Sequence, residues 1–177
     1  MTYAEIIGQI FGILGLIIIV SSFQSKGNKG FFILQGAGSL MFVINFFLIG
    51  AIPGALYNLA NFIRGMIYAK NTKKPYKLIL VLVLYTLCFA FSLTTIWGNA
   101  FQIFLSALTY SALMIMSVFM YFGNGKHIRY FQILYMSPSW LIYNIFNFTI
   151  GGILCESFNM ISSIIALIRY RKTGFEK

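Results

Sequence analysis

Apolar residues run along the chain in seven stretches, each close to the length of a membrane-spanning helix. They cover residues 4 to 24, 31 to 49, 51 to 69, 77 to 97, 100 to 122, 128 to 148 and 150 to 170. A helix that crosses the bilayer core needs about 20 apolar residues. Gly50 with Pro53, and Thr149 with Gly151 and Gly152, mark tight turns that divide two longer apolar segments. The pattern predicts an all-α polytopic membrane protein with seven transmembrane helices.

Composition supports this prediction. The 177-residue chain is 59% hydrophobic and 9% charged, which is more apolar than a soluble domain of this size. The first run follows Met-Thr-Tyr-Ala-Glu without a positive n-region, so we expect a retained span and not a cleaved signal peptide. The net charge of +10 does not indicate a nucleic-acid partner, because the basic residues fall in short loops and not along one stripe.

The basic loops predict how the chain sits in the membrane. Lys and Arg follow the first, third, fifth and seventh runs, and the other three connections have none. The residues are Lys26, Lys29, Lys70, Lys73, Lys74, Lys77, Lys126, Arg129, Arg169, Arg171, Lys172 and Lys177. The positive-inside rule then places the N-terminus outside and the C-terminus in the cytoplasm. Arg64 is the one Lys or Arg residue that departs from this pattern.

An internal repeat indicates how the runs are grouped. A shift of 98 residues lays residues 31 to 70 on residues 129 to 168, and pairs Ser39 with Ser137, Gly54 with Gly152 and Asn61 with Asn159. We therefore expect two three-helix bundles, residues 1–70 and 100–177, joined by a basic loop and linker helix over residues 71–99. One linking helix restores the direction of the chain, so the bundles should be parallel, in a 3+1+3 arrangement.

Polar residues inside the third and seventh runs are the main candidates for a site. At the same register of the repeat, the third run carries Asn58, Asn61 and Arg64, and the seventh carries Glu156, Asn159 and Ser162. A charged side chain at the centre of a span costs about 2.5 to 3.5 kcal/mol on insertion scales, so such residues usually face the protein interior or water. We expect both stripes to line a central cavity.

Two of these residues allow a structural alternative. Glu156 could be a substrate ligand or a proton carrier, or its carboxylate could make an interhelical hydrogen bond that only fixes the packing. Arg64 lies six residues before Lys70, so its side chain could line the cavity or extend to the cytoplasmic surface.

The sixth run carries a proline and a polar-aromatic group. Pro138 lacks an amide proton and frees the carbonyl of Leu134, which gives either a simple kink or a hinge for alternating access. Trp140 and Asn144 follow on the same helix, and an aromatic ring beside an amide suits a planar or sugar-like solute. Tyr143 could equally be an interface anchor.

The sequence offers no catalytic or metal-binding constellation. Cys88 and Cys155 lie in apolar runs without metal-ligand spacing, and His127 lies in a basic loop between Lys126 and Arg129. We therefore expect no enzyme activity, metal or cofactor. The expected partners are the lipid bilayer, a small-molecule solute and a possible second copy of the chain.

The stretches FFLIGAIPGALYNLANFIRGMIYAKN and SWLIYNIFNFTIGGILCESFNMISSIIALIRYRK resemble the YgjV-type bacterial inner-membrane proteins over most of the chain. That family looks like a distant relative of the SWEET, PQ-loop and PnuC transporters, which join two three-helix bundles by a linker helix. In SWEET-like proteins, asparagines on the third and seventh helices line the sugar pocket, a role that the resemblance assigns to Asn61 and Asn159. This chain has no Pro-Gln dipeptide in its first or fifth run, so the PQ-loop kinking mechanism is not carried over.

These observations predict a carrier in the bacterial inner membrane, facilitative or proton-linked, for a small polar solute such as a sugar or nucleoside-like molecule. Asn58, Asn61, Arg64, Trp140, Asn144, Glu156 and Asn159 are the expected binding residues, with Pro138 as the hinge. The alternative is a structural or receptor-like membrane protein whose polar residues only hold the helices together.

Overall fold

The computed structural model describes residues 2–22, 28–69, 74–123 and 125–173, which form helices and no strand. The elements are α1 (Tyr3–Ser22), α2 (Asn28–Leu48), α3 (Ile52–Ala69), α4 (Pro75–Thr95), α5 (Ala100–Phe122), α6 (Gly125–Phe131), the π-helical turn η1 (Gln132–Met136), α7 (Ser137–Phe146) and α8 (Ile150–Thr173). Because α6, η1 and α7 follow one another without a break, these residues make seven helical rods, one for each predicted run.

Five of the helices are long and apolar enough to cross a membrane by themselves. They cover Tyr3–Ser22, Lys29–Leu48, Pro75–Thr95, Ala100–Phe122 and Ile150–Arg169. The helix α3 falls short because it carries Asn58, Asn61 and Arg64. The rod α6–η1–α7 falls short because the π-helical turn divides it into pieces of 7, 5 and 10 residues. The prediction of an all-α membrane protein is confirmed.

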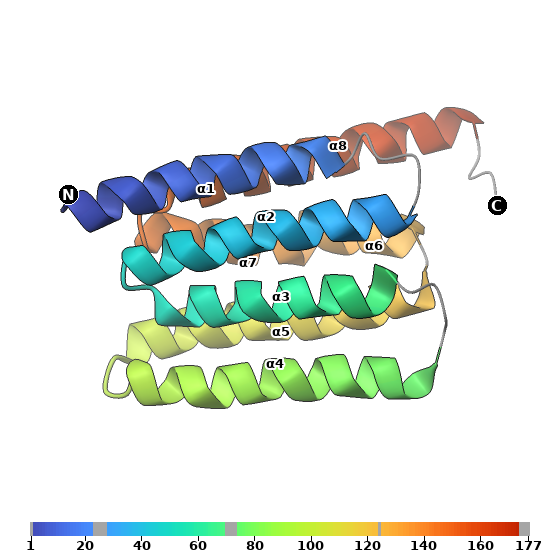
Figure 1. Ribbon diagram of the computed structural model, residues 1–177. Helices are drawn as coiled ribbons and strands as arrows, with labels where there is room; N and C mark the ends of the chain where they lie inside the picture. Colours follow the sequence, from blue (N-terminus) through green and yellow to red (C-terminus); the bar gives the residue numbers. More distant parts are fainter. Residues whose placement is uncertain (1, 23–27, 70–73, 124, 174–177) are drawn as a thin grey trace.

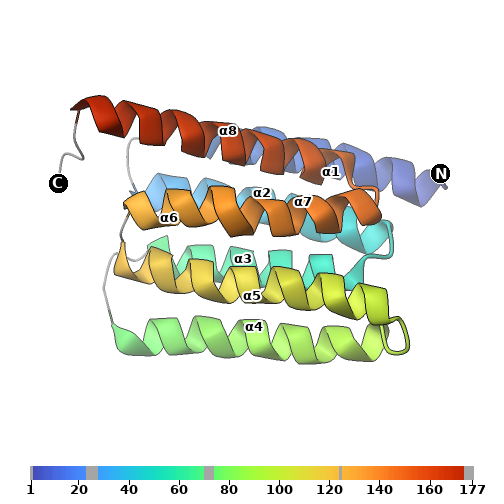
Figure 2. The ribbon, with the colours of Figure 1, turned by 180° about the vertical axis from the view of Figure 1, so that it is seen from behind.

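The rods lie side by side and alternate in direction (Figures 1 and 2). Neighbouring contacts join α1 to α2, α2 to α3, α3 to α5, α5 to the rod α6–η1–α7, that rod to α8, and α8 back to α1. Six rods therefore form a closed ring, and α4 packs outside it against α3 and α5. This ring encloses the space in which the candidate site lies.

The two ends of the ring differ in their connections (Figure 1). At one end, which we call the turn end, short turns join α2 to α3, α4 to α5 and α7 to α8. At the other, which we call the basic end, lie the described basic residues Lys29, Lys74, Lys77, Lys126, Arg129 and Arg169. Lys26, Lys70, Lys73, Lys177 and the side chains of Arg171 and Lys172, which also entered the prediction of orientation, lie outside the described residues.

The turns after α2 and α7 have the same hydrogen-bond pattern at an offset of 98 residues. Residues with a left-handed backbone occupy the same place in both, Gly50 with φ 79° and Phe148 with φ 52°. The matching pairs of amide-to-carbonyl bonds are Ile49–Asn45 with Asn147–Tyr143, Gly50–Phe47 with Phe148–Ile145, Ala51–Phe46 with Thr149–Asn144, and Ala55–Ala51 with Ile153–Thr149. The offset equals the one that relates the two halves of the sequence.

Gly151 and Gly152 do not form the second turn, as the sequence had suggested, but lie in the first turn of α8. A Cβ atom on Gly151 would lie 2.3 Å from the carbonyl carbon of Gly12, so α8 and α1 approach backbone to backbone there. A Cβ on Gly152 would lie 2.3 Å from the side-chain oxygen of Asn144. The two glycines are needed for close helix packing, the usual role of small residues in membrane helices.

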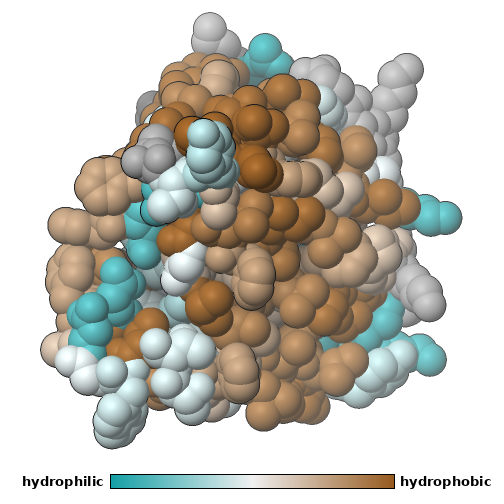
Figure 3. All heavy atoms as spheres, turned by 60° about the vertical axis from the view of Figure 1, so that its left-hand side comes forward, coloured by the Kyte–Doolittle hydropathy of each residue, from teal (hydrophilic) through white to brown (hydrophobic). Residues whose placement is uncertain are grey.

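Apolar side chains cover most of the molecular face drawn in Figure 3. The helix α4 illustrates the pattern, since its buried residues Lys77, Val81, Tyr85 and Ser92 form one stripe toward α3 and α5. Ile79, Leu80, Val83, Leu87 and Phe91 are exposed on the same helix. Exposed apolar side chains suit contact with lipid, so the outer face of α4 suits the lipid bilayer.

Candidate solute-binding cavity

A cavity of about 670 Å³ lies at the centre of the ring. All six rods of the ring contribute to its wall, and Lys77 adds a side chain from α4. Each of the seven residues expected to bind a solute lines it, namely Asn58, Asn61, Arg64, Trp140, Asn144, Glu156 and Asn159. The polar stripes of α3 and α8 thus face one common space, and their role in binding stays a prediction.

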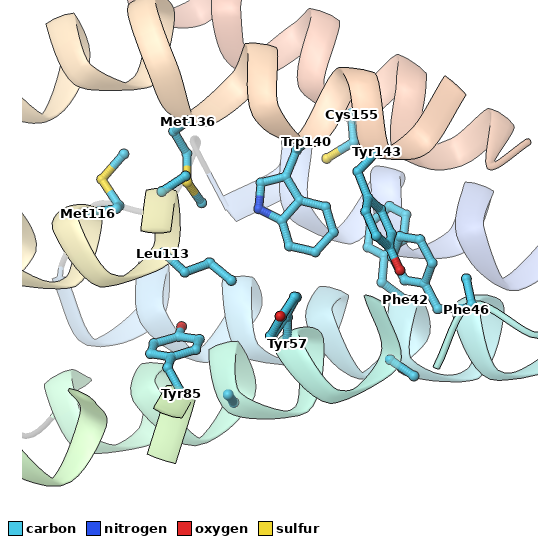
Figure 4. Packing of buried hydrophobic residues seen from close by; sticks show 14 of the residues in the cluster. Phe42, Phe46, Tyr57, Tyr85, Leu113, Met116, Met136, Trp140, Tyr143 and Cys155 are labelled. Carbon is cyan, nitrogen blue, oxygen red and sulfur yellow. The ribbon is translucent and has the colours of Figure 1, made fainter. Parts of the chain in front are cut away.

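Aromatic side chains pack together in the part of the cavity wall that lies toward the turn end (Figure 4). Trp140 is buried, with ring centroids 5.9 Å from Phe46, 5.5 Å from Tyr143 and 6.4 Å from Tyr57. The indole nitrogen of Trp140 points toward Leu113 and Met136 and away from Tyr143 (Figure 4). Trp140 can therefore offer an aromatic face and an N–H donor to a solute.

The asparagines of the two stripes are held to different degrees. The amide nitrogen of Asn58 donates to the carbonyl of Gly54 at 2.9 Å, within its own helix. The side-chain oxygen of Asn61 accepts from the hydroxyl of Tyr85 on α4. The side-chain nitrogen of Asn159 makes a long contact of 3.9 Å with the sulfur of Cys155. The contact of Asn159 is thus the longest of the three, and this residue lies beside Glu156 in the cavity wall.

Asn144 combines a place in the cavity wall with a structural bond. Its side-chain oxygen accepts a hydrogen bond of 2.6 Å from the hydroxyl of Thr149, and both residues are buried. The same oxygen packs against Gly152 in the first turn of α8. The oxygen of Asn144 is therefore used to join α7 to α8, which leaves it poorly placed to bind a solute.

Glu156 ends a chain of hydrogen bonds that begins on η1. The amide nitrogen of Gln132 donates to the hydroxyl of Ser137 at 2.6 Å, and this hydroxyl donates to the carboxylate of Glu156 at 2.6 Å. Both Gln132 and Glu156 line the cavity. The carboxylate can accept a proton or a hydrogen bond from a solute, and Ser137, the residue before Pro138, connects it to Gln132.

Arg64 points inward and does not extend to the surface. Its guanidinium donates to the hydroxyl of Ser117 on α5 at 3.2 Å and lies 5.9 Å from the centre of the Tyr85 ring. Ser117 and Tyr85 are fully buried. Of the two alternatives that the sequence left open for Arg64, the structure places the residue on the cavity.

The backbone around Pro138 departs from α-helical bonding. The amide of Ser137 donates to the carbonyl of Gln132, five residues earlier, which defines the π-helical turn η1. Such π-helical turns arise where one extra residue is inserted into an α-helix without breaking it, and they often lie at functional sites. The expected irregularity lies where Pro138 predicted it, and its use as a hinge stays a prediction.

Sequence reasoning missed part of the wall. Gln132, Lys77 and Arg129 line the cavity, although charge counting had treated the two basic residues as topological markers. Ser163 lines it in place of Ser162. Positions i, i+3 and i+7 stay on one helical face whereas i+6 drifts away, so a 3.6-residue period applied strictly from Glu156 would have selected Ser163.

Among the described residues, no three His, Cys, Asp or Glu side chains come close enough to hold a metal ion. Cys88 and Cys155 are free thiols. The side chains around the cavity can form hydrogen bonds, stack against a ring and carry charge or a proton. These abilities suit reversible binding of a polar molecule.

Fold and cavity together define a multi-pass helical membrane protein with a polar chamber among its helices. The chain belongs to the YgjV family of bacterial inner membrane proteins, whose family model matches residues 6–174. It is therefore a multi-pass protein of the bacterial inner membrane, as its sequence had indicated. No curated protein and no solved structure matches the chain, so its resemblance to the SWEET, PQ-loop and PnuC transporters stays a prediction.

Proposed function

We propose that this protein is a transporter of a small polar solute, such as a sugar or nucleoside-like molecule, that works by alternating access. In this proposal all seven rods cross the membrane in a 3+1+3 arrangement, with α1–α3 and α5–α8 as the two bundles and α4 as the linker. The N-terminus lies outside and the basic end lies in the cytoplasm, as the positive-inside rule requires.

The observation that carries the proposal is a polar cavity that extends from the middle of the ring to its basic end, while interhelical bonds join the two halves at the turn end. Its wall extends to Phe31, Gly123 and Gly125, which lie where helices begin or end at the basic end. At the turn end, the amide of Gly54 donates to the hydroxyl of Tyr143 at 2.8 Å. A pathway from one side to the middle of the membrane is what an inward-facing carrier needs.

Further contacts seal the turn end between the two halves of the chain. The side-chain nitrogen of Gln9 donates to the carbonyl of Phe148 at 2.6 Å, and its oxygen accepts from the amide of Ile150 at 3.0 Å. Gly12 and Gly151 are in backbone contact beside them. These bonds join α1 to the α7–α8 turn, so opening this end requires the halves to separate.

Uptake by proteoliposomes tests the proposal. A panel of labelled sugars, nucleosides and other polar metabolites is screened for flux that depends on the protein. Asn61→Ala and Asn159→Ala should each lower uptake at least tenfold while the amount of folded protein stays the same. The matched control is Asn147→Ala, which removes a side-chain nitrogen that bonds to the carbonyl of Tyr143, four residues earlier. Flux that is absent for every solute, or indifferent to both asparagines, would contradict transport.

A structural role for the polar residues is the second candidate function. It is favoured by Asn45, whose side chain holds two helices together. Its side-chain nitrogen donates to the carbonyl of Gly8 at 2.8 Å, and the buried residue joins α2 to α1. If Glu156 and Asn159 served only this purpose, Glu156→Gln and Asn159→Ala would lower the yield of folded protein. If they serve a solute, folding is retained and stabilisation by that solute is altered.

A further inference from the structure

The wall of the cavity carries more positive than negative charge. Arg64 from α3, Lys77 from α4 and Arg129 from α6 line it, and Glu156 is the acidic residue among its lining side chains. The chain has only three Asp and Glu residues. Glu5 lies in the first turn of α1, at the opposite end, and Glu176 is outside the described residues. Three cations therefore share a chamber with one carboxylate.

Arg64 is oriented for a ligand, because its neighbours hold it without neutralising it. Ser117 and Tyr85, the partners that fix the guanidinium, are both uncharged at neutral pH. A guanidinium has five N–H donors, and one of those of Arg64 bonds to the hydroxyl of Ser117 at 3.2 Å. Ser117 and Tyr85 cannot occupy all five donors, so a molecule in the cavity can bind to the others and to the charge.

Lys77 and Arg129 add charge to the same end of the chamber. Lys77 is buried, with 6% of its surface exposed, and its amino group donates to the carbonyl of Ile67 at 3.3 Å. Arg129 is partly buried in α6, one turn from Gln132. A guanidinium held in a low-dielectric interior is costly unless a counter-charge meets it, and this cost applies to Arg64 and Arg129. The wall supplies one carboxylate, and that group accepts a hydrogen bond from Ser137.

We propose that the basic half of the cavity binds the anionic group, a carboxylate or phosphate, of the transported solute, with Arg64 and Arg129 as direct ligands and Lys77 adding charge. This inference rests on the proposed transport function and narrows its substrate class to small organic anions. The planar fork of Arg matches the geometry of carboxylate and phosphate. The headgroup of an anionic lipid has the same chemistry, but a chamber ringed by six rods favours a soluble molecule.

Thermal unfolding in nanodiscs tests the anion site with inorganic phosphate as the probe. In phosphatidylcholine nanodiscs, phosphate should raise the unfolding midpoint in a saturable way, and sodium chloride of equal ionic strength should not. Arg64→Gln and Arg129→Gln should each weaken the apparent phosphate affinity at least tenfold. Lys126→Gln removes an exposed charge from the same helix as Arg129 and should change the affinity less than twofold. Arg64→Lys retains the charge and should weaken binding less than Arg64→Gln.

The outcomes separate the possibilities. A midpoint that responds to phosphate no more than to chloride, or a response unchanged in both Gln variants, overturns the inference. Adding phosphatidylglycerol to the nanodiscs should leave the phosphate response intact, and its loss would assign the site to lipid and overturn the solute class. Asn61-dependent uptake of a neutral solute without phosphate binding overturns this inference alone. Saturable phosphate binding without uptake of any solute overturns transport and leaves the anion site standing.

Discussion

At the scale of single residues, the molecule separates two uses of polar side chains inside a membrane. Some of them join helices, as Tyr57 does when its hydroxyl contacts Ser106 on α5 at 2.6 Å. Others, such as Asn159 and Glu156, keep polar atoms on the cavity and take few or weak bonds from the protein. A polar group in a low-dielectric interior is stable when it is bonded. A ligand or a proton would therefore supply the further bonds that the polar atoms of Asn159 and Glu156 can make.

Glu156 gives the prediction that belongs to this scale. If its carboxylate carries the coupling proton, Glu156→Gln should abolish the response of uptake to an imposed pH gradient while solute exchange at equal pH continues. Ser137 can still donate to the amide oxygen that replaces the carboxylate, so folding should be retained. The measurement is flux of the solute identified in the uptake screen, with and without the gradient.

Glu5, one of the three acidic residues of the chain, provides a matched control for Glu156. Glu5→Gln removes a carboxylate that accepts from the amide of Thr2 at 2.8 Å at the start of α1. Its response to the gradient should equal that of the unsubstituted protein. A response that persists in Glu156→Gln would show that transport is facilitative or is coupled through another group.

At the scale of helices, the apolar pattern was sufficient to predict the elements. Each predicted run overlaps one rod, because a bilayer-length stretch of apolar residues has no other way to satisfy its backbone. The shared face of α3 and α8 was also predictable from Asn61 and Asn159, which line the cavity together. Because the two asparagines hold the same position in the internal repeat, the sequence predicted that both line the same cavity.

The unpredicted part of the wall depends on tertiary contacts. Lys77 and Arg129 lie near helix ends, where a linear sequence cannot distinguish a loop charge from one turned inward by neighbouring rods. Gln132 lies in η1, whose extra backbone residue changes the helical face that a regular period would assign. Asn144 was predicted as a ligand, but the turn to α8 engages its oxygen.

The rod α6–η1–α7 carries the prediction at the scale of elements. Pro138→Ala restores an amide that can donate to the carbonyl of Leu134, so the rod should become more regular and the protein more stable, by about 1 kcal/mol or more. If the irregularity is a hinge, uptake should become at least severalfold slower although binding of the solute is unchanged. Thermal unfolding and initial uptake rates measure the two effects.

Pro75→Ala is the control for that substitution. Pro75 stands at the start of α4, a position where the missing amide would have no partner within the helix. Its replacement should leave the uptake rate unchanged. Unchanged transport in Pro138→Ala would mean that the kink is only structural.

At the scale of the whole molecule, the two halves meet differently at the two ends. At the turn end, α1 touches α8 through Gly12 and Gly151, and the bond from Gly54 to Tyr143 joins α3 to α7. Near the basic end, Tyr68 joins α3 to α5 through the carbonyl of Ser117, and the cavity extends past it to Gly125. In an alternating-access cycle, the contacts at the turn end must open for the solute to enter from that side.

Tyr143→Phe should therefore shift the molecule toward states that are open at the turn end. The substitution removes an acceptor that is worth about 1 kcal/mol and leaves the amide of Gly54 without its partner in the closed state. Since 1.4 kcal/mol is a factor of ten in population, the open state should become several times more populated. A cysteine at Asn58, with Cys88 and Cys155 replaced by serine, should then react faster with a membrane-impermeant thiol reagent applied from the turn-end side.

The same labelling experiment distinguishes a gate from general loosening of the bundle. Tyr68→Phe removes a hydroxyl that also bonds across to α5, at 3.2 Å, but near the basic end. It should leave the reactivity from the turn-end side unchanged. If both substitutions accelerate labelling equally, loss of either hydroxyl only loosens the bundle. If Tyr143→Phe alone accelerates labelling, the contact between Tyr143 and Gly54, which joins the two repeats, keeps the turn end closed. Reaction only with reagent added from the cytoplasm, in every variant, would contradict a pathway that opens at the turn end.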